Sequence, residues 1–179
     1  SFHPVKLITT GEGGACVTNS EQIAQKMRLF REHGITRDSE RMQSPSETKP
    51  FYYEQVDLGF NYRMTDMQAA LGLNQIKRLD NFINKRHEIS GIYYNRLKNL
   101  PLILPFQHQD TQTAFHLYVV QLDPKFEYAG GRDKLFTQLR AAEIGVNVHY
   151  IPVHTQPYYQ KIGFELGQFP HAEQYYKHA

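Results

Sequence analysis

A lysine at position 6 is the residue in this chain whose surroundings most favour covalent chemistry. It lies in SFHPVKLITTGEGG, residues 1–14, where the pattern predicts a short strand over 5–10, a glycine-rich turn and a second strand over 15–18. A lysine amine held out of bulk water near polar groups loses its proton more readily than a solvated one. Such an amine attacks aldehydes and ketones, so the pattern indicates Schiff-base chemistry at Lys6.

A second group of polar residues comes just before a predicted helix, in VDLGFNYRMTDMQAALGLNQIKRLD, residues 56–80. Thr65 is expected to cap that helix. On physical grounds alone, Asn61 would hydrogen-bond nearby backbone, as asparagines in tight loops do. Arg63 and Asp66 are expected to hold the loop.

The segment RLFREHGITR, residues 28–37, has the pattern of a helix end. Gly34 is expected to end the helix in the left-handed conformation, with basic residues near the last carbonyls. His33 is then a capping residue rather than a base. Arg37 lies beyond the helix, where its planar guanidinium could bind a diphosphate or a partner subunit.

Histidines and tyrosines gather in HYIPVHTQPYYQKIGF, residues 149–164. His149 is expected in a strand, packed and hydrogen-bonded. Pro152 ends that strand and leaves His154, with Tyr158 after it, in a loop that could form the mouth of a substrate site. The alternative is that His154 belongs to the fold.

The elements that would position these residues follow an α/β pattern. Ser20 is expected to cap a helix carrying Ile23, Met27 and Phe30, and the polar segment 37–53 is expected to be a loop. An apolar periodicity then predicts a helix from Thr65 to Leu97 with little interruption. The later elements are expected to be strands at 116–122 and 146–150 and a helix at 131–143, which form a small α+β layer.

Composition excludes several functions. The chain has 179 residues, a net charge of +2 and 21% charged residues, too little basic excess to indicate nucleic-acid binding. No apolar run approaches the roughly 20 residues that span a bilayer. The nine histidines and single cysteine have no spacing that predicts a metal site. Cys16 is expected to be a buried structural thiol, which fits a cytoplasmic location.

The segments 1–14, 56–80 and 149–164 together resemble the DegT/DnrJ/EryC1/StrS sugar aminotransferases, pyridoxal phosphate (PLP) enzymes of the aspartate-aminotransferase, type I fold. The resemblance implies that Lys6 forms the Schiff base with PLP and that Ser1, supported by His3, donates to the phosphate. It also implies that Asn61 reaches the phosphate bound to the neighbouring subunit, which makes the enzyme a homodimer with composite sites.

The substrate side of the resemblance is to members acting on UDP-linked 4-keto-6-deoxy sugars in pseudaminic acid biosynthesis, with an amino acid such as glutamate as donor. By that resemblance His154 and Tyr158 bind the nucleotide sugar, and Arg37 is expected to join them because its guanidinium suits phosphate oxygens. Residues 1–85 would be the end of the large PLP-binding domain with its linker helix, and residues 86–179 an incomplete small domain.

Two alternatives stay open. A dehydratase of the same fold has histidine in place of the cofactor lysine, and this chain has lysine. The second is a non-catalytic fragment that binds no cofactor. The chain begins inside a motif and ends within a helical pattern, so we expect it to be the carboxy-terminal half of an enzyme whose ring-stacking aromatic and pyridine-binding aspartate lie upstream.

Overall fold

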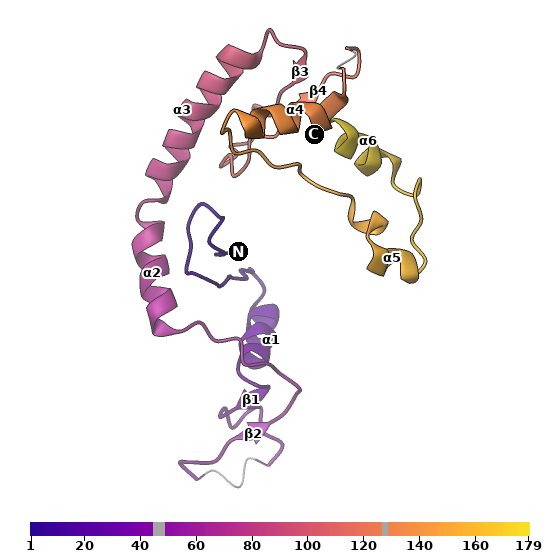
Figure 1. Ribbon diagram of the computed structural model, residues 1–179. Helices are drawn as coiled ribbons and strands as arrows, with labels where there is room; N and C mark the ends of the chain where they lie inside the picture. The colour runs from indigo at the N-terminus through magenta and orange to yellow at the C-terminus, as the bar shows by residue number, and fades with distance from the viewer. Residues whose placement is uncertain (45–48, 127–128) are drawn as a thin grey trace. The chain divides into compact units, whose positions relative to one another are not determined.

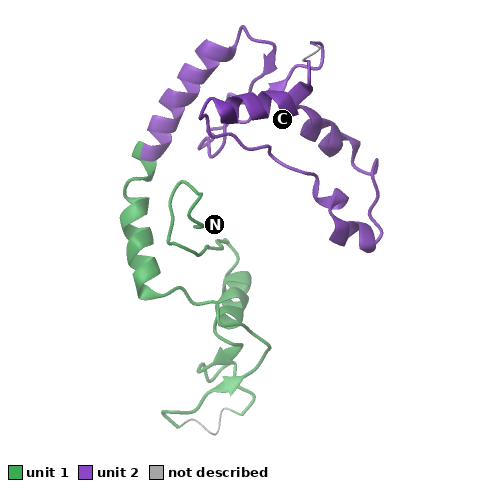
Figure 2. Ribbon diagram, in the orientation of Figure 1, with its two compact units in different colours: residues 1–81 green, residues 82–179 purple. Residues whose placement is uncertain are grey.

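The computed structural model describes residues 1–44, 49–126 and 129–179. The chain forms two compact units, residues 1–81 and 82–179, which Figure 2 distinguishes by colour. The division falls inside a helix, close to the expected domain boundary between residues 85 and 86. That these units correspond to the large and small domains of an enzyme stays a prediction.

Among its described residues, the first unit contains two helices, a minimal sheet and the start of a third helix (Figure 1). In chain order the elements are α1 (Glu21–Arg31), β1 (Ile35–Thr36), β2 (Glu54–Gln55), α2 (Asp66–Ile76) and α3 (Leu79–Leu97), of which α3 continues into the second unit. Strands β1 and β2 pair antiparallel, with Ile35 opposite Gln55.

The second unit continues α3 and adds, in the part of it that the structure describes, a second minimal sheet and four helical segments (Figure 1). The elements are β3 (Leu102–Ile103), β4 (Gln121–Leu122), α4 (Gly131–Ala141), the 3₁₀ turn η2 (Val153–Thr155), α5 (Pro157–Lys161) and α6 (Pro170–His178). Strands β3 and β4 pair antiparallel, and Leu122, opposite Leu102, is 6% exposed. Within the described ranges, no helix combines the length and apolar character needed to cross a membrane.

Both predicted helix caps are confirmed. The Ser20 hydroxyl accepts a hydrogen bond from the Ile23 N–H at the start of α1. Thr65 starts α2 with a reciprocal capping box, in which its side chain accepts from the Gln68 N–H and the Gln68 side chain accepts from the Thr65 N–H. These bonds satisfy N–H groups that the first helical turn leaves without partners.

The predicted strands around the glycine-rich turn are wrong. Residues 5–10 and 15–18 form turns and irregular chain, because Phe2 closes the segment on itself. Its N–H donates to the Gly13 carbonyl at 2.8 Å, and its carbonyl accepts from the Thr10 N–H at 3.0 Å and the Thr9 hydroxyl at 2.9 Å. Lys6 therefore lies on a closed loop rather than on a strand.

Three further expectations, for one helix and two strands, need correction. The helix predicted from Thr65 to Leu97 is divided into α2 and α3 at Lys77 and Arg78. The strand expected over 146–150 is absent, and that expected over 116–122 is reduced to β4. The predicted loop over 37–53 has turns and bends where it is described, and residues 45–48 of it lie outside the described residues.

The end of α1 is crossed at close range by the segment that leads to α2. Gly34 is left-handed, at φ +70°, but α1 ends at Arg31 with Glu32 as its cap, and His33, at φ +62°, is the first left-handed residue after it. A Cβ on Gly34 would come within 1.9 Å of the Asp57 carbonyl oxygen. A Cβ on Gly59 would come within 2.2 Å of the Gly34 nitrogen. The crossing is held by the N–H of Phe60, which donates to the Phe30 carbonyl at 2.7 Å, and by a bridge between Glu32 and Asn61.

We expect Gly34→Ala to lower the free energy of unfolding by at least about 2 kcal/mol, because the added methyl group meets backbone and the positive φ strains an L residue. Gly91 in α3 is the matched control, since a Cβ there meets nothing within 4 Å. Gly91→Ala should raise the free energy of unfolding by up to about 1 kcal/mol. Urea denaturation measures both, and an unchanged Gly34→Ala variant would contradict the close crossing.

Candidate active site

Lys6 lies on the closed loop of residues 2–13, and its side chain is exposed rather than held out of bulk water as expected. Its N–H donates to the His3 carbonyl at 2.9 Å. The Ser1 hydroxyl oxygen accepts from the His3 N–H at 3.4 Å, and His3 Nε2 lies 3.7 Å from a carboxylate oxygen of Glu12. The loop thus gathers an amine, a hydroxyl and an imidazole from its own residues.

One glutamine side chain joins this loop to the start of α2. The Nε2 group of Gln68 donates to the Glu12 carbonyl at 3.1 Å, while its Oε1 accepts from the Thr65 N–H at 3.0 Å. The buried Thr10 hydroxyl donates to the same Glu12 carbonyl at 2.5 Å. Because both ends of the Gln68 amide are used, the position of the Lys6 loop depends on the cap of α2.

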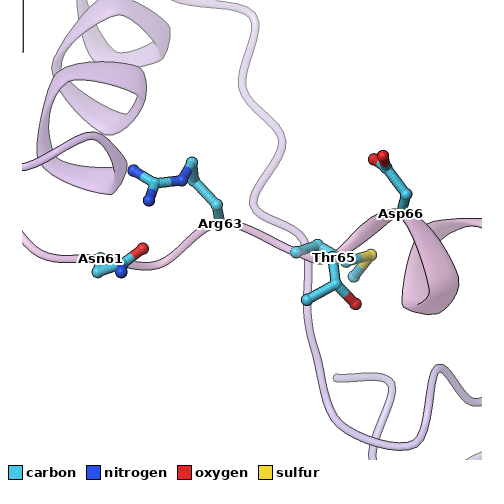
Figure 3. Close-up of a pocket in the computed structure, with 5 residues that line it drawn as sticks. Asn61, Arg63, Thr65 and Asp66 are labelled. Atoms are coloured by element: carbon cyan, nitrogen blue, oxygen red, sulfur yellow. The ribbon is translucent and has the colours of Figure 1, made fainter.

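An open pocket of about 610 Å³ lies at the entry to α2. Its lining residues are Asn61, Arg63, Met64, Thr65 and Asp66, and Figure 3 shows Thr65 and Asp66 directing their side chains to opposite sides of the chain. The Arg63 guanidinium lies 3.1 Å from a carboxylate oxygen of Glu32, at the end of α1. This ion pair fits the structural role expected of Arg63.

The pocket is close to the Lys6 loop. The side chain of Met64 is near enough that a Cβ on Gly13 would lie 2.8 Å from the Met64 Cε atom. A Cβ on Gly72 would lie 2.8 Å from the Thr10 methyl group. The first unit therefore packs the Lys6 loop against the start of α2 beside Asn61, whereas Lys6 and Ser1 are not among the residues that line the pocket.

Arg37 lies beyond β1, and its guanidinium carbon is 6.0 Å from the centroid of the Tyr53 ring. The chain after it is tied down by Glu54, whose carboxylate accepts from the N–H groups of Gln43 at 2.5 Å and Ser44 at 2.9 Å. Desolvation raises the pKa of Glu54, but these hydrogen bonds outweigh it and leave the pKa lowered.

His154 and Tyr158 belong to the second unit and differ in exposure. His154 is 6% exposed, with its Nε2 atom 2.8 Å from Oε1 of Glu173. The hydrogen bond from His154, together with one from the Gly167 N–H, lowers the pKa of Glu173. Tyr158 is 67% exposed and meets the Tyr159 ring edge-on at 5.4 Å between centroids.

The structure adds two residues that sequence reasoning missed. Gln68 carried a readable signal, because Thr-x-x-Gln before an apolar run is a capping-box pattern. Glu173 carried none, since it lies nineteen residues from His154 along the chain. Cys16, expected to be buried, is exposed. Among the described residues, no group of three histidine, cysteine, aspartate or glutamate side chains could hold a metal ion.

Comparison with known proteins covers the whole chain. The family model described as the DegT/DnrJ/EryC1/StrS aminotransferase family matches residues 1–179. The chain is 42% identical over 180 residues to the spore coat polysaccharide biosynthesis protein SpsC of Bacillus subtilis. It is 38% identical over 178 residues to a UDP-4-amino-4,6-dideoxy-N-acetyl-beta-L-altrosamine transaminase of Campylobacter jejuni. Each match covers 99% of this chain but 46% and 44% of the relatives, so the chain spans less than half their length.

The structural comparison agrees. Helicobacter pylori PseC, an aminotransferase involved in the biosynthesis of pseudoaminic acid, superposes with a TM-score of 0.81 at 30% identity, covering 99% of this chain and 45% of PseC. A putative sugar aminotransferase of Streptococcus pneumoniae, in its PLP form, gives a TM-score of 0.81 at 24% identity and supports the fold. The predicted fold class, part of the type I PLP-dependent fold, is confirmed, and PLP is the cofactor of these enzymes. The chain belongs to the DegT/DnrJ/EryC1/StrS aminotransferase family.

Proposed function

We propose that this chain carries the reactive lysine of a PLP-dependent transaminase that aminates a nucleotide-diphosphate 4-keto-6-deoxy sugar, with an amino acid such as glutamate as donor. Within that class we propose a UDP-linked N-acetylated sugar, in a cytoplasmic enzyme of cell-surface polysaccharide synthesis. The relatives named above as an altrosamine transaminase and a coat polysaccharide protein support this choice. The observation that carries it is the closed loop of residues 2–13, which holds the Lys6 amine beside the Ser1 hydroxyl and the His3 imidazole.

The residues of the Lys6 loop fit one end of PLP. The phosphate needs several hydrogen-bond donors, and the chain offers the Ser1 hydroxyl to its own site and the Asn61 amide to the site of a second subunit. Lys6 offers an exposed amine on the loop that starts with Ser1. We assign Ser1 and Asn61 to the phosphate and Lys6 to the covalent link.

When bound, PLP supplies an electron sink that stabilises negative charge on the carbon next to the transferred nitrogen. The Nζ atom of Lys6 would first act as the nucleophile that holds the cofactor. Released by the amino donor, the same Nζ would take a proton from one carbon and deliver it to another. A single amine can do this because it alternates between base and acid.

The other assignments concern the partner and the substrate. We propose that Asn61 serves the site of a second subunit, so that the enzyme is a homodimer in which each site uses both chains. Arg37 and Tyr158 are proposed to meet the nucleotide sugar, because a guanidinium suits phosphate oxygens and an exposed aromatic ring suits a base or sugar face.

The transaminase and the non-catalytic fragment predict different labelling when PLP is added. In the transaminase, borohydride reduction of PLP-loaded protein should fix one cofactor on Lys6, detectable by peptide mass spectrometry. Lys6→Ala should abolish this labelling and lower turnover by at least about 100-fold, the scale of losing a positioned acid–base group. Lys26→Ala, an exposed lysine on α1, should change neither, and labelling spread over several lysines would support the fragment.

The composite site predicts rescue between inactive subunits. Lys6→Ala and Asn61→Ala homodimers should each be inactive, whereas mixing them should restore part of the activity, since one site of a mixed dimer has both intact residues. Mixed dimers are verified by differently tagged subunits. Mixed dimers that form without any rescue would show that Asn61 serves its own subunit or only its loop.

A substitution at Gln68 can separate its role in the helix cap from its role in holding the Lys6 loop. In Gln68→Glu, a carboxylate oxygen still accepts from the Thr65 N–H, so α2 keeps its cap, but the donor to the Glu12 carbonyl is lost. We expect PLP affinity to fall about fivefold, which corresponds to one hydrogen bond of about 1 kcal/mol, while helix content stays unchanged. PLP titration followed by absorbance, with far-UV circular dichroism as control, checks this; undiminished affinity would contradict the dependence.

A further inference from the structure

One oxygen atom of Glu173 joins three segments of the second unit. Glu173 lies in the first turn of α6. Its Oε1 atom accepts from the Gly167 N–H at 2.7 Å and lies 2.8 Å from Nε2 of His154, which belongs to η2. The turn around Gly167, η2 and α6 therefore share a single acceptor.

The His154 ring is also held on its face. Its centroid lies 4.8 Å from that of Phe169, and Phe169 in turn lies 6.2 Å from Phe164. The side chain of His154 is 6% exposed and that of Glu173 22% exposed. Because an ionised carboxylate only accepts hydrogen bonds, the Nε2 atom must carry the hydrogen of this bond. The hydrogen bond and the Phe169 contact thus hold the ring in one orientation, with a hydrogen on Nε2.

The backbone beside His154 leads directly to the exposed Tyr158. The Thr155 N–H and hydroxyl both bond to the Pro152 carbonyl, at 3.0 and 2.8 Å. After one more residue, α5 begins at Pro157. An imidazole fixed by Glu173 therefore fixes the start of the short helix that presents Tyr158, whereas the buried His154 ring itself points into its own unit.

We infer that Glu173 is a positioning residue for substrate binding: through His154 it sets the place of α5 and of Tyr158, which meets the nucleotide sugar. This inference rests on the proposed function. The role of His154 is then indirect, in place of the direct substrate contact expected from the sequence. The half-reaction with the amino donor should not depend on the His154–Glu173 pair.

The pairing itself is tested by NMR of the chain labelled with ¹⁵N-histidine, which reports the ring nitrogen that carries hydrogen. The wild-type spectrum should show His154 with hydrogen on Nε2. The His154 signal is assigned by its disappearance in His154→Gln, and Glu173→Ala should shift it. Glu165→Ala is the matched control, an exposed glutamate in the same turn, and should leave it in place. Hydrogen on Nδ1 alone in the wild type would overturn the inference.

The functional part is tested by stopped-flow measurement of the two half-reactions in PLP-loaded protein. Glu173→Ala should weaken use of the sugar nucleotide by about tenfold or more, the scale of a lost hydrogen bond to a charged group, and leave the half-reaction with glutamate within about twofold. Glu173→Gln should restore most of the loss, because its amide oxygen can accept both bonds. His154→Gln, which keeps a donor near Nε2, should lose less than His154→Ala.

Equal losses in both half-reactions of Glu173→Ala, or no loss in either, would overturn the inference while leaving the transaminase intact. Binding of UDP-N-acetylglucosamine to the wild type, measured by calorimetry, is the separate check on the proposed function. A wild type that neither binds this probe nor reacts with glutamate would overturn the proposed function, and the substrate role of Glu173 with it.

Discussion

The amide of Gln68 is the interaction on which the candidate site depends. Its oxygen completes the cap of α2, and its nitrogen holds the Glu12 carbonyl of the loop that carries Lys6. The start of α2 and the Lys6 loop are thereby held together by one rigid, planar group, through a hydrogen bond between residues 56 positions apart. An amide suits this role because it presents an acceptor and a donor at a fixed separation, which neither a carboxylate nor an ammonium group does.

Local rules predicted the parts of the fold that local bonds determine. The caps at Ser20 and Thr65 and the left-handed Gly34 were readable because each depends on residues within one helical turn. The strands around Lys6 were predicted wrongly because a short apolar segment next to glycines does not reveal where its backbone groups will bond. Here Phe2 takes the partners that a neighbouring strand would have supplied.

The site was predictable to a similar extent. The motif around Lys6 marked this lysine as a candidate, but its proposed role in binding PLP came from the family resemblance rather than from its chemistry alone. The open loop expected around His154 contains a ring that is 6% exposed, because the sequence gives no sign that a carboxylate nineteen residues later completes its environment. Burial of a polar side chain depends on hydrogen-bond partners that can be distant in sequence, and local residue spacing does not predict which residues these are.

The crossing of Gly34 and Gly59 has an evolutionary consequence. The atoms nearest to a Cβ at either position are backbone atoms of the other strand of the crossing, and backbone cannot be made smaller by substitution. A clash with a bulky side chain can be relieved by trimming that side chain, but here no second-site exchange at a neighbouring residue creates room. Selection for suppressors of a Gly34 variant should therefore yield true revertants, and the two glycines should persist without covarying with any other position.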